Sequence, residues 1–267
     1  MCQLLGMNAN KPASIKFSFE GFVLRGGRTD EHRDGWGLAF FEGHACRTLH
    51  DCRPSADSPL VEHLHRHPVK SRNIIAHIRK ATQGGLSLQN CHPFTRELWG
   101  QHWAFAHNGN LKNFDLRLSG RYLPVGETDS EHAFCYLLQE LGHRFGALAP
   151  TTPELFEALV ELSARVAAFG PFNFLLSNGS GLFAYCTTEL HFVTRCYPFA
   201  SVRVLDHDLQ VDFGRYNHLD DCMSVIATKP LTSGEDWTAF APGELRYFFD
   251  GAPTRKGVLR RQLAVSV

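Results

Sequence analysis

Predicted strands follow one another in runs along this chain, while its two longest predicted helices lie next to each other. The first helix has Thr128 or Asp129 as its cap, and its apolar residues recur at helical spacing, at Phe134, Leu137, Leu138 and Leu141. The second begins at Pro153 and ends before Gly170. This organisation is typical of the α+β class, in which helices cover mainly antiparallel sheets.

Short strands are expected on both sides of this helical block. After it they span residues 172–176, 182–186, 190–194, 201–205, 224–228 and 245–249. Asn178-Gly179 between two of them is a strong hairpin signal. Before the block we expect strands at 1–7, 38–41, 73–78 and 103–106 and a helix at 59–65. Residues 15–23 have helical spacing, although the alternation of Ile15, Phe17 and Phe19 also fits a strand.

The chain has no internal repeat, low-complexity tract or linker-like break. Its 267 residues and 43% hydrophobic content are enough for one large core. We therefore predict a single domain over residues 2–250, followed by a C-terminal tail over residues 251–267. The basic residues of this tail indicate a solvated end, with contact to a partner as the alternative; they are Arg255, Lys256, Arg260 and Arg261.

Charge and hydropathy exclude several classes of partner. Lys and Arg number 27 and Asp and Glu also 27, so the whole surface has no attraction for nucleic acid or an anionic membrane. No apolar run is long enough for a membrane span, and residues 1–14 lack the pattern of a signal peptide. A cytoplasmic location is expected. The eight cysteines form no C-x-x-C pair and are expected to be reduced thiols, most of them buried.

Histidine is frequent, with fifteen residues, which raises the question of a metal site. His63, His65 and His67 alternate along a predicted helix, and this spacing does not place all three on one face. A solvated helix end before Pro68 is the simpler interpretation. We expect no metal and no cofactor.

Cys2 follows the initiator Met, which is usually removed before a small residue. Removal would leave a free α-amine on the same carbon as the thiol. The reference pKa of the amine is about 7.7 to 8.0 and that of the thiol about 8.5, so the amine can accept the thiol proton. Cys2 is therefore a candidate nucleophile. Taken alone, a cysteine at this position is more simply interpreted as a small buried side chain on a first strand.

Three further positions could complete such a site. Asn108-Gly109, at a sharp strand end, could supply an amide side chain and a backbone N–H to a developing oxyanion, although Asn-Gly is also an ordinary turn. Arg79 could grip a carboxylate with two hydrogen bonds, or form a surface ion pair. Asp129 could accept an ammonium group, or simply cap its helix.

The order and spacing of these elements resembles the class II glutamine amidotransferases, which are N-terminal-nucleophile hydrolases. The resemblance rests on Cys2, followed by the stretches 77–82, 107–110 and 127–131, with further matching motifs at 25–27, 34–37, 90–94 and 226–231. It extends from Cys2 to about Phe249 and looks closest to the small stand-alone YafJ-like members, which lack an attached synthase domain.

This resemblance implies a four-layer αββα sandwich of two mainly antiparallel sheets. It implies that Cys2 attacks the side-chain amide of glutamine, which gives a γ-glutamyl thioester and ammonia, and that water then releases glutamate. Arg79 would bind the substrate α-carboxylate and Asp129 its α-amine, while Asn108 and Gly109 would form the oxyanion hole. Thr82 and His92 lie in family motifs near the substrate pocket, which we expect them to support.

One departure from the family pattern concerns Lys80. Many synthase-linked relatives have a Trp at this position, where it helps to close the pocket. The alternatives to a glutaminase are therefore a hydrolase of γ-glutamyl peptides or conjugates and a non-catalytic protein that binds a ligand or partner. If the chain is a glutaminase, a separate synthase or acceptor protein is the expected recipient of the ammonia.

Overall fold

The computed structural model describes residues 2–258 of the chain, and within them the strands form three sheets. The first half contains β1 (Gln3–Ser14), α1 (Lys16–Leu24), β2 (Trp36–Glu42), β3 (Ala45–Asp51), η1 (Ser55–Asp57), α2 (Pro59–Arg66), β4 (Lys70–Ile78), η2 (Leu88–Asn90), β5 (Phe94–Leu98), β6 (Gln101–Gly109) and α3 (Asp129–Phe145). The second half contains α4 (Thr152–Ala167), β7 (Phe172–Ser177), β8 (Leu182–Cys186), β9 (His191–Cys196), β10 (Ser201–Val204), β11 (Gln210–Asp212), η3 (Phe213–Arg215), β12 (Cys222–Ala227), β13 (Thr232–Ser233), β14 (Thr238–Ala239), β15 (Glu244–Phe249) and β16 (Ala252–Val258).

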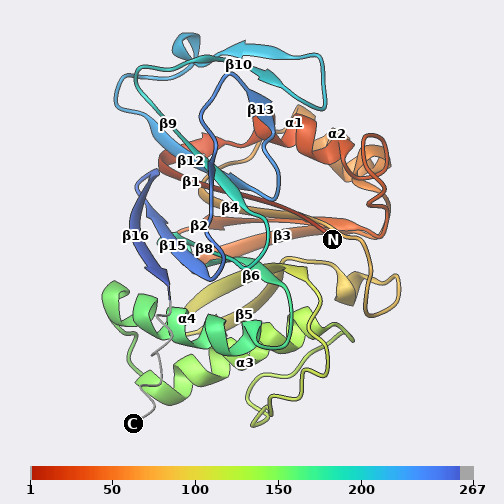
Figure 1. The fold of residues 1–267 in the computed structure, drawn as a ribbon. Coiled ribbons are helices and arrows are strands. Elements are labelled where there is room, and N and C mark those ends of the chain that lie inside the picture. The colour runs from red at the N-terminus through yellow and green to blue at the C-terminus, as the bar shows by residue number, and fades with distance from the viewer. Residues whose placement is uncertain (1, 259–267) are drawn as a thin grey trace, which may run out of the picture.

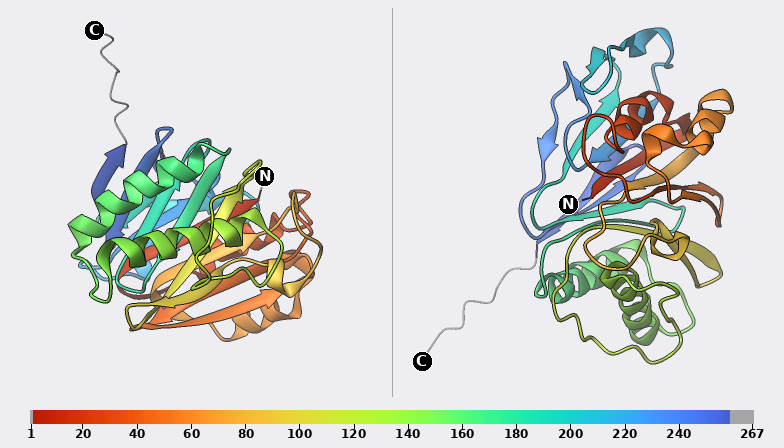
Figure 2. Two further views of the ribbon diagram at one scale, coloured as in Figure 1. Left: turned by 90° about the horizontal axis from the view of Figure 1, so that it is seen from below. Right: turned by 90° about the vertical axis from the view of Figure 1, so that its right-hand side faces the viewer.

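Two large sheets face each other between helical layers. The first has the strand order β14-β9-β12-β1-β4-β2-β3 and the second β16-β15-β8-β7-β6-β5, with antiparallel pairs throughout. Helices α1 and α2 cover the outer face of the first sheet, and α3 and α4 cover that of the second (Figures 1 and 2). The structure thus confirms the expected four-layer αββα sandwich of the α+β class.

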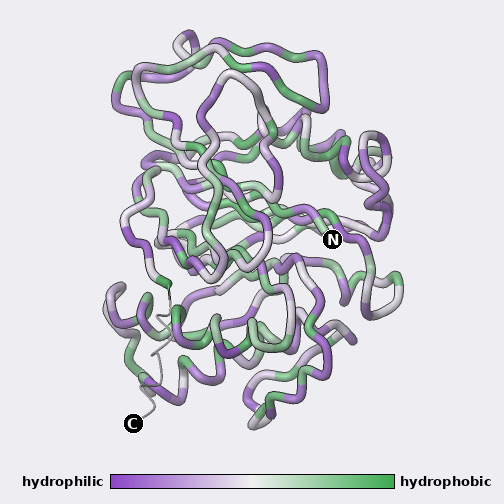
Figure 3. Tube along the Cα trace, in the orientation of Figure 1, coloured by the Kyte–Doolittle hydropathy of each residue, from purple (hydrophilic) through white to green (hydrophobic). Residues whose placement is uncertain are grey.

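Hydrophobic side chains fill three layers, one between the sheets and one under each helix pair. In Figure 3 the apolar segments run through strands and helices, while polar segments are frequent in the peripheral loops. The layer between the sheets contains Leu4 and Ile75 from the first sheet and Leu175 from the second. Gly6 allows the close approach, since a Cβ there would lie 3.0 Å from the side chains of Leu175 and Leu182.

Strand β1 alternates between these layers. Leu4 belongs to the layer between the sheets, while Leu5 and Met7 pack in the layer under α1. Its register with β4 pairs Gln3 with Ile78 and Leu4 with His77. Because residues that face each other across a strand pair point to the same side of the sheet, the continuation of this register brings Cys2 beside Arg79 on the inner face.

The long helices begin as their caps predict. The Thr128 hydroxyl accepts the Glu131 N–H at 3.2 Å, so Thr128 and not Asp129 is the cap of α3. In α4, Thr151 and Glu154 form a capping box. The Asn178-Gly179 turn joins the antiparallel pair β7 and β8, which confirms the predicted hairpin.

Two features correct the sequence analysis. Residues 252–258, expected to lie in the tail, form the edge strand β16 and pair with β15, so the sheet continues past the expected boundary at residue 250. Arg255 and Lys256 are exposed on this strand, while Arg260 and Arg261 lie outside the described residues. Second, Cys196 and Cys222 form a disulfide, because the register of β9 and β12 places them opposite each other with 4.4 Å between their Cα atoms.

Candidate active site

Cys2 lies at the start of β1, on the face of the first sheet that points to the second. Its side chain is buried, with 8% of the residue exposed. The sulfur accepts the backbone N–H of Lys80 at 3.3 Å and approaches the carbonyl oxygen of Lys80 at 3.4 Å. The alternation along β1 is what turns the thiol inward, away from α1.

Charged groups from two other elements act on this thiol. Burial raises the pKa of Cys2 above its ordinary value, while the Lys80 N–H and the Arg79 guanidinium lower it and the Asp129 carboxylate raises it. The thiol is therefore protonated near neutral pH unless a base removes its proton. Arg79 and Asp129, which are fifty residues apart in the sequence, are close enough to the sulfur for both charges to be felt.

Asn108 and Gly109 end β6 in the opposite sheet. The Asn108 side chain is fully buried and donates from Nδ2 to the Thr228 hydroxyl at 3.5 Å, while its Oδ1 has no hydrogen-bond partner in residues 2–258. The Asn108 carbonyl accepts from the side chain of Asn173 at 2.8 Å. Gly109 is required by space, because a Cβ there would lie 1.8 Å from the Pro171 carbonyl oxygen.

Thr228 connects the two sheets at this point. Its hydroxyl accepts the backbone N–H of Leu4 at 2.9 Å as well as the Asn108 amide, and its own N–H donates to the Leu4 carbonyl at 3.1 Å. The sequence analysis included this residue in a matching motif but gave it no role. Its contacts depend on where β12 ends relative to β1 and β6, which no local pattern shows.

Arg79 follows β4 and is buried, with 2% of the residue exposed. Its guanidinium donates to the backbone carbonyls of Gln83, Gly84 and Gly85 at 2.8 to 3.1 Å. No carboxylate in the described part of the chain forms an ion pair with it, so the surface ion pair considered as an alternative is wrong. A buried cation held by neutral carbonyls keeps its positive charge available for an anion.

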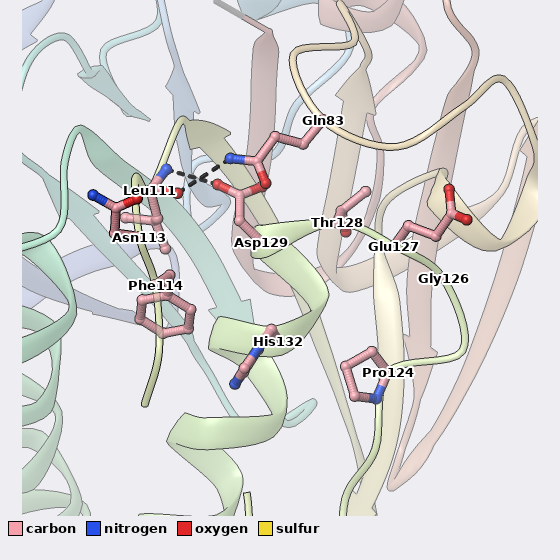
Figure 4. A pocket seen from close by; sticks show the side chains of 10 residues that line it. All are labelled: Gln83, Leu111, Asn113, Phe114, Pro124, Gly126, Glu127, Thr128, Asp129 and His132. Atoms are coloured by element: carbon pink, nitrogen blue, oxygen red, sulfur yellow. Dashed lines mark hydrogen bonds between the residues drawn. The ribbon is translucent and has the colours of Figure 1, made fainter. Parts of the chain in front are cut away.

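Asp129 opens α3 and lines a cavity of about 320 Å³ at the surface (Figure 4). Its Oδ2 accepts the Leu111 N–H at 2.7 Å, and the neighbouring Gln83 side chain donates to the Leu111 carbonyl at 3.1 Å. The rest of the cavity is lined by Asn113, Phe114, Pro124, Gly126, Glu127, Thr128 and His132.

The charges of this cavity favour a cation. Two carboxylates line it, those of Asp129 and Glu127, and neither Lys nor Arg is among its lining residues. Gln83 is a second residue that sequence reasoning missed. Its position between Arg79 and the Gly84-Gly85 turn was the available signal. A turn that folds back over a buried arginine brings its own side chains close to that arginine.

The two remaining predicted residues lie in different surroundings. Thr82 is exposed on the turn that follows Lys80. His92 is buried and packs against His77, with 4.1 Å between ring centroids and the rings tilted by 40°, and neither of its ring nitrogens has a hydrogen bond within residues 2–258. Burial lowers the pKa of His92 well below its ordinary value and that of His77 to about 3, so both imidazoles are uncharged.

Lys80 and Ala81 are tied to the loop before β2. The Lys80 ammonium forms an ion pair with Glu31. Asp34 joins the same loop to this segment, because its carboxylate accepts the Ala81 N–H at 2.7 Å and its own N–H donates to the Arg79 carbonyl at 3.1 Å. The segment whose main chain contacts Cys2 is therefore held to this loop by polar contacts.

Residues 2–258 show neither a metal-binding cluster nor a membrane-spanning helix. No group of three or more His, Cys, Asp or Glu side chains is arranged to hold a metal ion. None of the described helices is both long enough and apolar enough to span a bilayer.

Comparison with known proteins places this geometry in a family. The family model for glutamine amidotransferases class-II matches residues 1–264. The chain belongs to the class II glutamine amidotransferases. It is therefore an enzyme of the amidotransferase type, with the fold that the resemblance implied.

Relatives support this assignment over almost the whole chain. The "Putative glutamine amidotransferase YafJ" of Escherichia coli strain K12 is 47% identical over 248 residues, which cover 93% of this chain and 97% of that protein. A Haemophilus influenzae protein with a similar description is 47% identical over 251 residues, or 94% of this chain and 85% of its own length. The crystal structure of a "predicted glutamine amidotransferase" from Pseudomonas aeruginosa is 40% identical, with a TM-score of 0.76 over 95% of this chain and all of that chain.

Proposed function

We propose that the chain hydrolyses the side-chain amide of glutamine with Cys2 as its nucleophile and delivers ammonia to a separate acceptor. The observation that supports this most is the meeting of β1 and the Asn108 amide at Thr228. The backbone N–H of Leu4, two residues after Cys2, and the Asn108 amide contact the same Thr228 hydroxyl from opposite sheets, and the charges of Arg79 and Asp129 act on the Cys2 thiol. A nucleophile, an oxyanion donor and a clamp for an amino acid are the parts that such a reaction needs.

The first half of the reaction begins with proton removal from Cys2. Because burial raises the thiol pKa, the α-amine of Cys2, free after removal of Met1, takes the proton. Met1 itself lies outside the described residues. The thiolate then forms a C–S bond with the amide carbon, and the carbonyl oxygen becomes an oxyanion that the Asn108 side chain and the Gly109 N–H stabilise. The C–N bond breaks when the amine returns its proton to the leaving nitrogen, which departs as ammonia.

The second half regenerates the enzyme. Water attacks the γ-glutamyl thioester, the same α-amine takes the water proton, and glutamate leaves as the C–S bond breaks. Arg79 holds the α-carboxylate through its remaining N–H groups, and Asp129 holds the α-ammonium at the edge of the acidic cavity. Thr82 and His92 support this pocket. We place the reaction in the cytoplasm, with a synthase or other acceptor protein as recipient of the ammonia.

A second candidate is the hydrolysis of γ-glutamyl peptides or conjugates. It is favoured by Lys80, since a flexible ammonium paired with Glu31 on the surface can move aside for a larger leaving group more easily than a packed indole. The two functions differ only in the leaving group that is released when the thioester forms, which is ammonia from glutamine and an amine from a γ-glutamyl peptide or conjugate. Comparing kcat/KM for glutamine with that for γ-glutamyl dipeptides separates them.

The decisive experiment uses protein from which Met1 has been removed. Incubation with glutamine is expected to release ammonia in amounts that depend on Cys2, and Cys2→Ser is expected to lose most of this activity. An electrophilic glutamine analogue should modify Cys2 alone, as mass spectrometry would show. If wild-type protein releases neither ammonia from glutamine nor glutamate from γ-glutamyl compounds, and Cys2 stays unmodified, a non-catalytic binding role replaces the proposal.

A further inference from the structure

Thr228 lies just after β12, where the first sheet approaches Asn108 of the second. The Thr228 side chain is buried, and its hydroxyl touches one group from each sheet. The group from the first sheet is the N–H of Leu4, two residues after Cys2. The group from the second is the Asn108 side-chain amide. One hydroxyl therefore contacts both the strand that bears the nucleophile and the proposed oxyanion donor.

The Thr228 hydroxyl accepts hydrogen bonds but lacks an acceptor for its own hydrogen in the described part of the chain. A threonine hydroxyl accepts through two lone pairs and donates one hydrogen. Here it accepts from Leu4 and from Asn108, and within residues 2–258 it donates to no acceptor. Oδ1 of Asn108 is an acceptor, is buried and is also without a partner. An unused donor and an unused acceptor thus lie on two side chains that already touch.

A half-turn of the Asn108 amide satisfies both groups. The turn exchanges Oδ1 with Nδ2, so that the Thr228 hydroxyl donates to Oδ1 and the two hydrogens of Nδ2 point to the place where Oδ1 had no partner. Little is lost in the exchange, since the contact between Nδ2 and the hydroxyl is 3.5 Å, at the long limit of a hydrogen bond.

We propose that Thr228 is a positioning residue that orients the Asn108 amide for the oxyanion and fixes its place relative to Cys2. The Leu4 N–H occupies one lone pair of the hydroxyl, which directs the hydroxyl hydrogen away from β1 and toward Asn108. Thr228 acts through Asn108 and touches neither the substrate nor the sulfur. This inference rests on the proposed function, because it assigns Asn108 the oxyanion role described above.

The test compares two substitutions at one position. Thr228→Val keeps the shape of the side chain and removes the hydroxyl, while Thr228→Ser keeps the hydroxyl. Thr228→Val is expected to lower kcat for glutamine at least tenfold with KM changed less than threefold, and Thr228→Ser to stay within threefold of wild type in both. Alkylation of Cys2 by iodoacetamide forms no oxyanion, so its rate should stay within threefold in both variants. A merely structural loss would slow alkylation as well as turnover.

A double-mutant cycle with Asn108→Ala gives a second, independent result. If Thr228 acts through Asn108, adding Thr228→Val to Asn108→Ala changes kcat less than threefold. Should Thr228→Val fail to fold, judged by circular dichroism, Thr228→Ala takes its place in the cycle. Full activity of the hydroxyl-free variant, or independent losses that multiply in the cycle, would overturn the inference. A wild-type enzyme without Cys2-dependent ammonia release would instead overturn the proposed function.

Discussion

The sulfur of Cys2 and the backbone nitrogen of Lys80 lie 3.3 Å apart, so Lys80 contacts the proposed nucleophile through its main chain. Its side chain points elsewhere, to Glu31 on the surface. The contact with the sulfur is therefore independent of which side chain stands at this position. Lys80 therefore contacts Cys2 through its main chain and Glu31 through its side chain.

Lys80→Ala is accordingly expected to keep kcat for glutamine within about threefold, since exposed ion pairs contribute little. Steady-state kinetics on the processed protein would measure it, with Glu31→Ala as the matched variant because it removes the other half of the same pair. A tenfold or larger fall in kcat in both variants would show that closure by this pair is needed for the chemistry.

Arg79→Lys is expected to raise KM for glutamine at least tenfold, equivalent to about 1.4 kcal/mol of binding. An ammonium cannot donate to the carbonyls of Gln83, Gly84 and Gly85 and also grip a carboxylate with two hydrogen bonds. The melting temperature should fall as well, because these carbonyls lose donors. Arg66→Lys, on the exposed face of α2, is the control and should change neither quantity. An unchanged KM for Arg79→Lys would remove Arg79 from substrate binding.

Gly109→Ala is expected to abolish activity and to destabilise the fold, because the new Cβ would meet the Pro171 carbonyl oxygen and the His107 ring within 2.4 Å. Gly142→Ala is the control. It lies inside α3, where a Cβ meets only ordinary contacts at 3.6 Å and beyond, and alanine favours a helix by up to about 1 kcal/mol. Thermal unfolding of both variants, with activity measured in parallel, checks the contrast; equal stability of the two would contradict it.

The activity should rise with pH through an apparent pKa of about 7.7 to 8.0, which is the range of an α-amine. The amine must be neutral to accept the thiol proton, so activity is lost as the pH falls below this range. A preformed thiolate would give a different profile, since burial raises the pKa of the Cys2 thiol and activity would rise at higher pH than an α-amine titrates. A pH series of kcat/KM distinguishes the two, and acetylation of the amine should abolish turnover.

Stability should fall in acid because buried imidazoles stay uncharged. Burial lowers the pKa of His77 to about 3 and lowers those of His92 and His107 below 6.5. Below about pH 6.5 the unfolded chain binds protons at these positions and the folded chain does not, so the free energy of unfolding decreases as the pH falls. Each such histidine contributes up to about 1.4 kcal/mol per pH unit.

Urea unfolding at pH 7, 6 and 5 measures this dependence. His92→Gln, which cannot titrate, should unfold with a shallower dependence on pH than wild type. A free energy of unfolding that is constant from pH 7 to 5 would mean that these imidazoles are hydrated or paired in the folded chain.

The sequence predicted the helices and the central strands because their signals are local. The apolar spacing of α3, its cap at Thr128, the first-turn Pro153 of α4 and the Asn178-Gly179 turn act within a few residues, and the structure has each of them. The edge strands β3, β5, β14 and β16 and the small sheet of β10, β11 and β13 were missed in whole or in part. These edge strands are largely solvated, so their apolar pattern is weak and their pairing is decided by distant partners.

The candidate site also combines locally predictable positions with contacts that depend on distant segments. The positions of Cys2, Arg79, Asn108, Gly109 and Asp129 could be predicted because each lies at an element end that the sequence marks, whereas their roles stay predictions. The contacts of the Thr228 hydroxyl could not be predicted. They join residues 120 and 224 positions apart, and their existence depends on strand register.

The alternation of β1 imposes an odd–even rule on the start of this chain. Cys2 shares the inner face with Leu4 and Gly6, and Leu5 and Met7 lie on the other face. Inserting or deleting a single residue between Cys2 and Leu4 would turn the thiol toward α1 and expose the wrong side chain to the second sheet. Two residues would restore the face but displace the thiol by about 6.6 Å. β1 can therefore be neither lengthened nor shortened here without displacing the Cys2 thiol, so we expect alterations of chain length to be tolerated only beyond the bulge between Asn8 and Ala13.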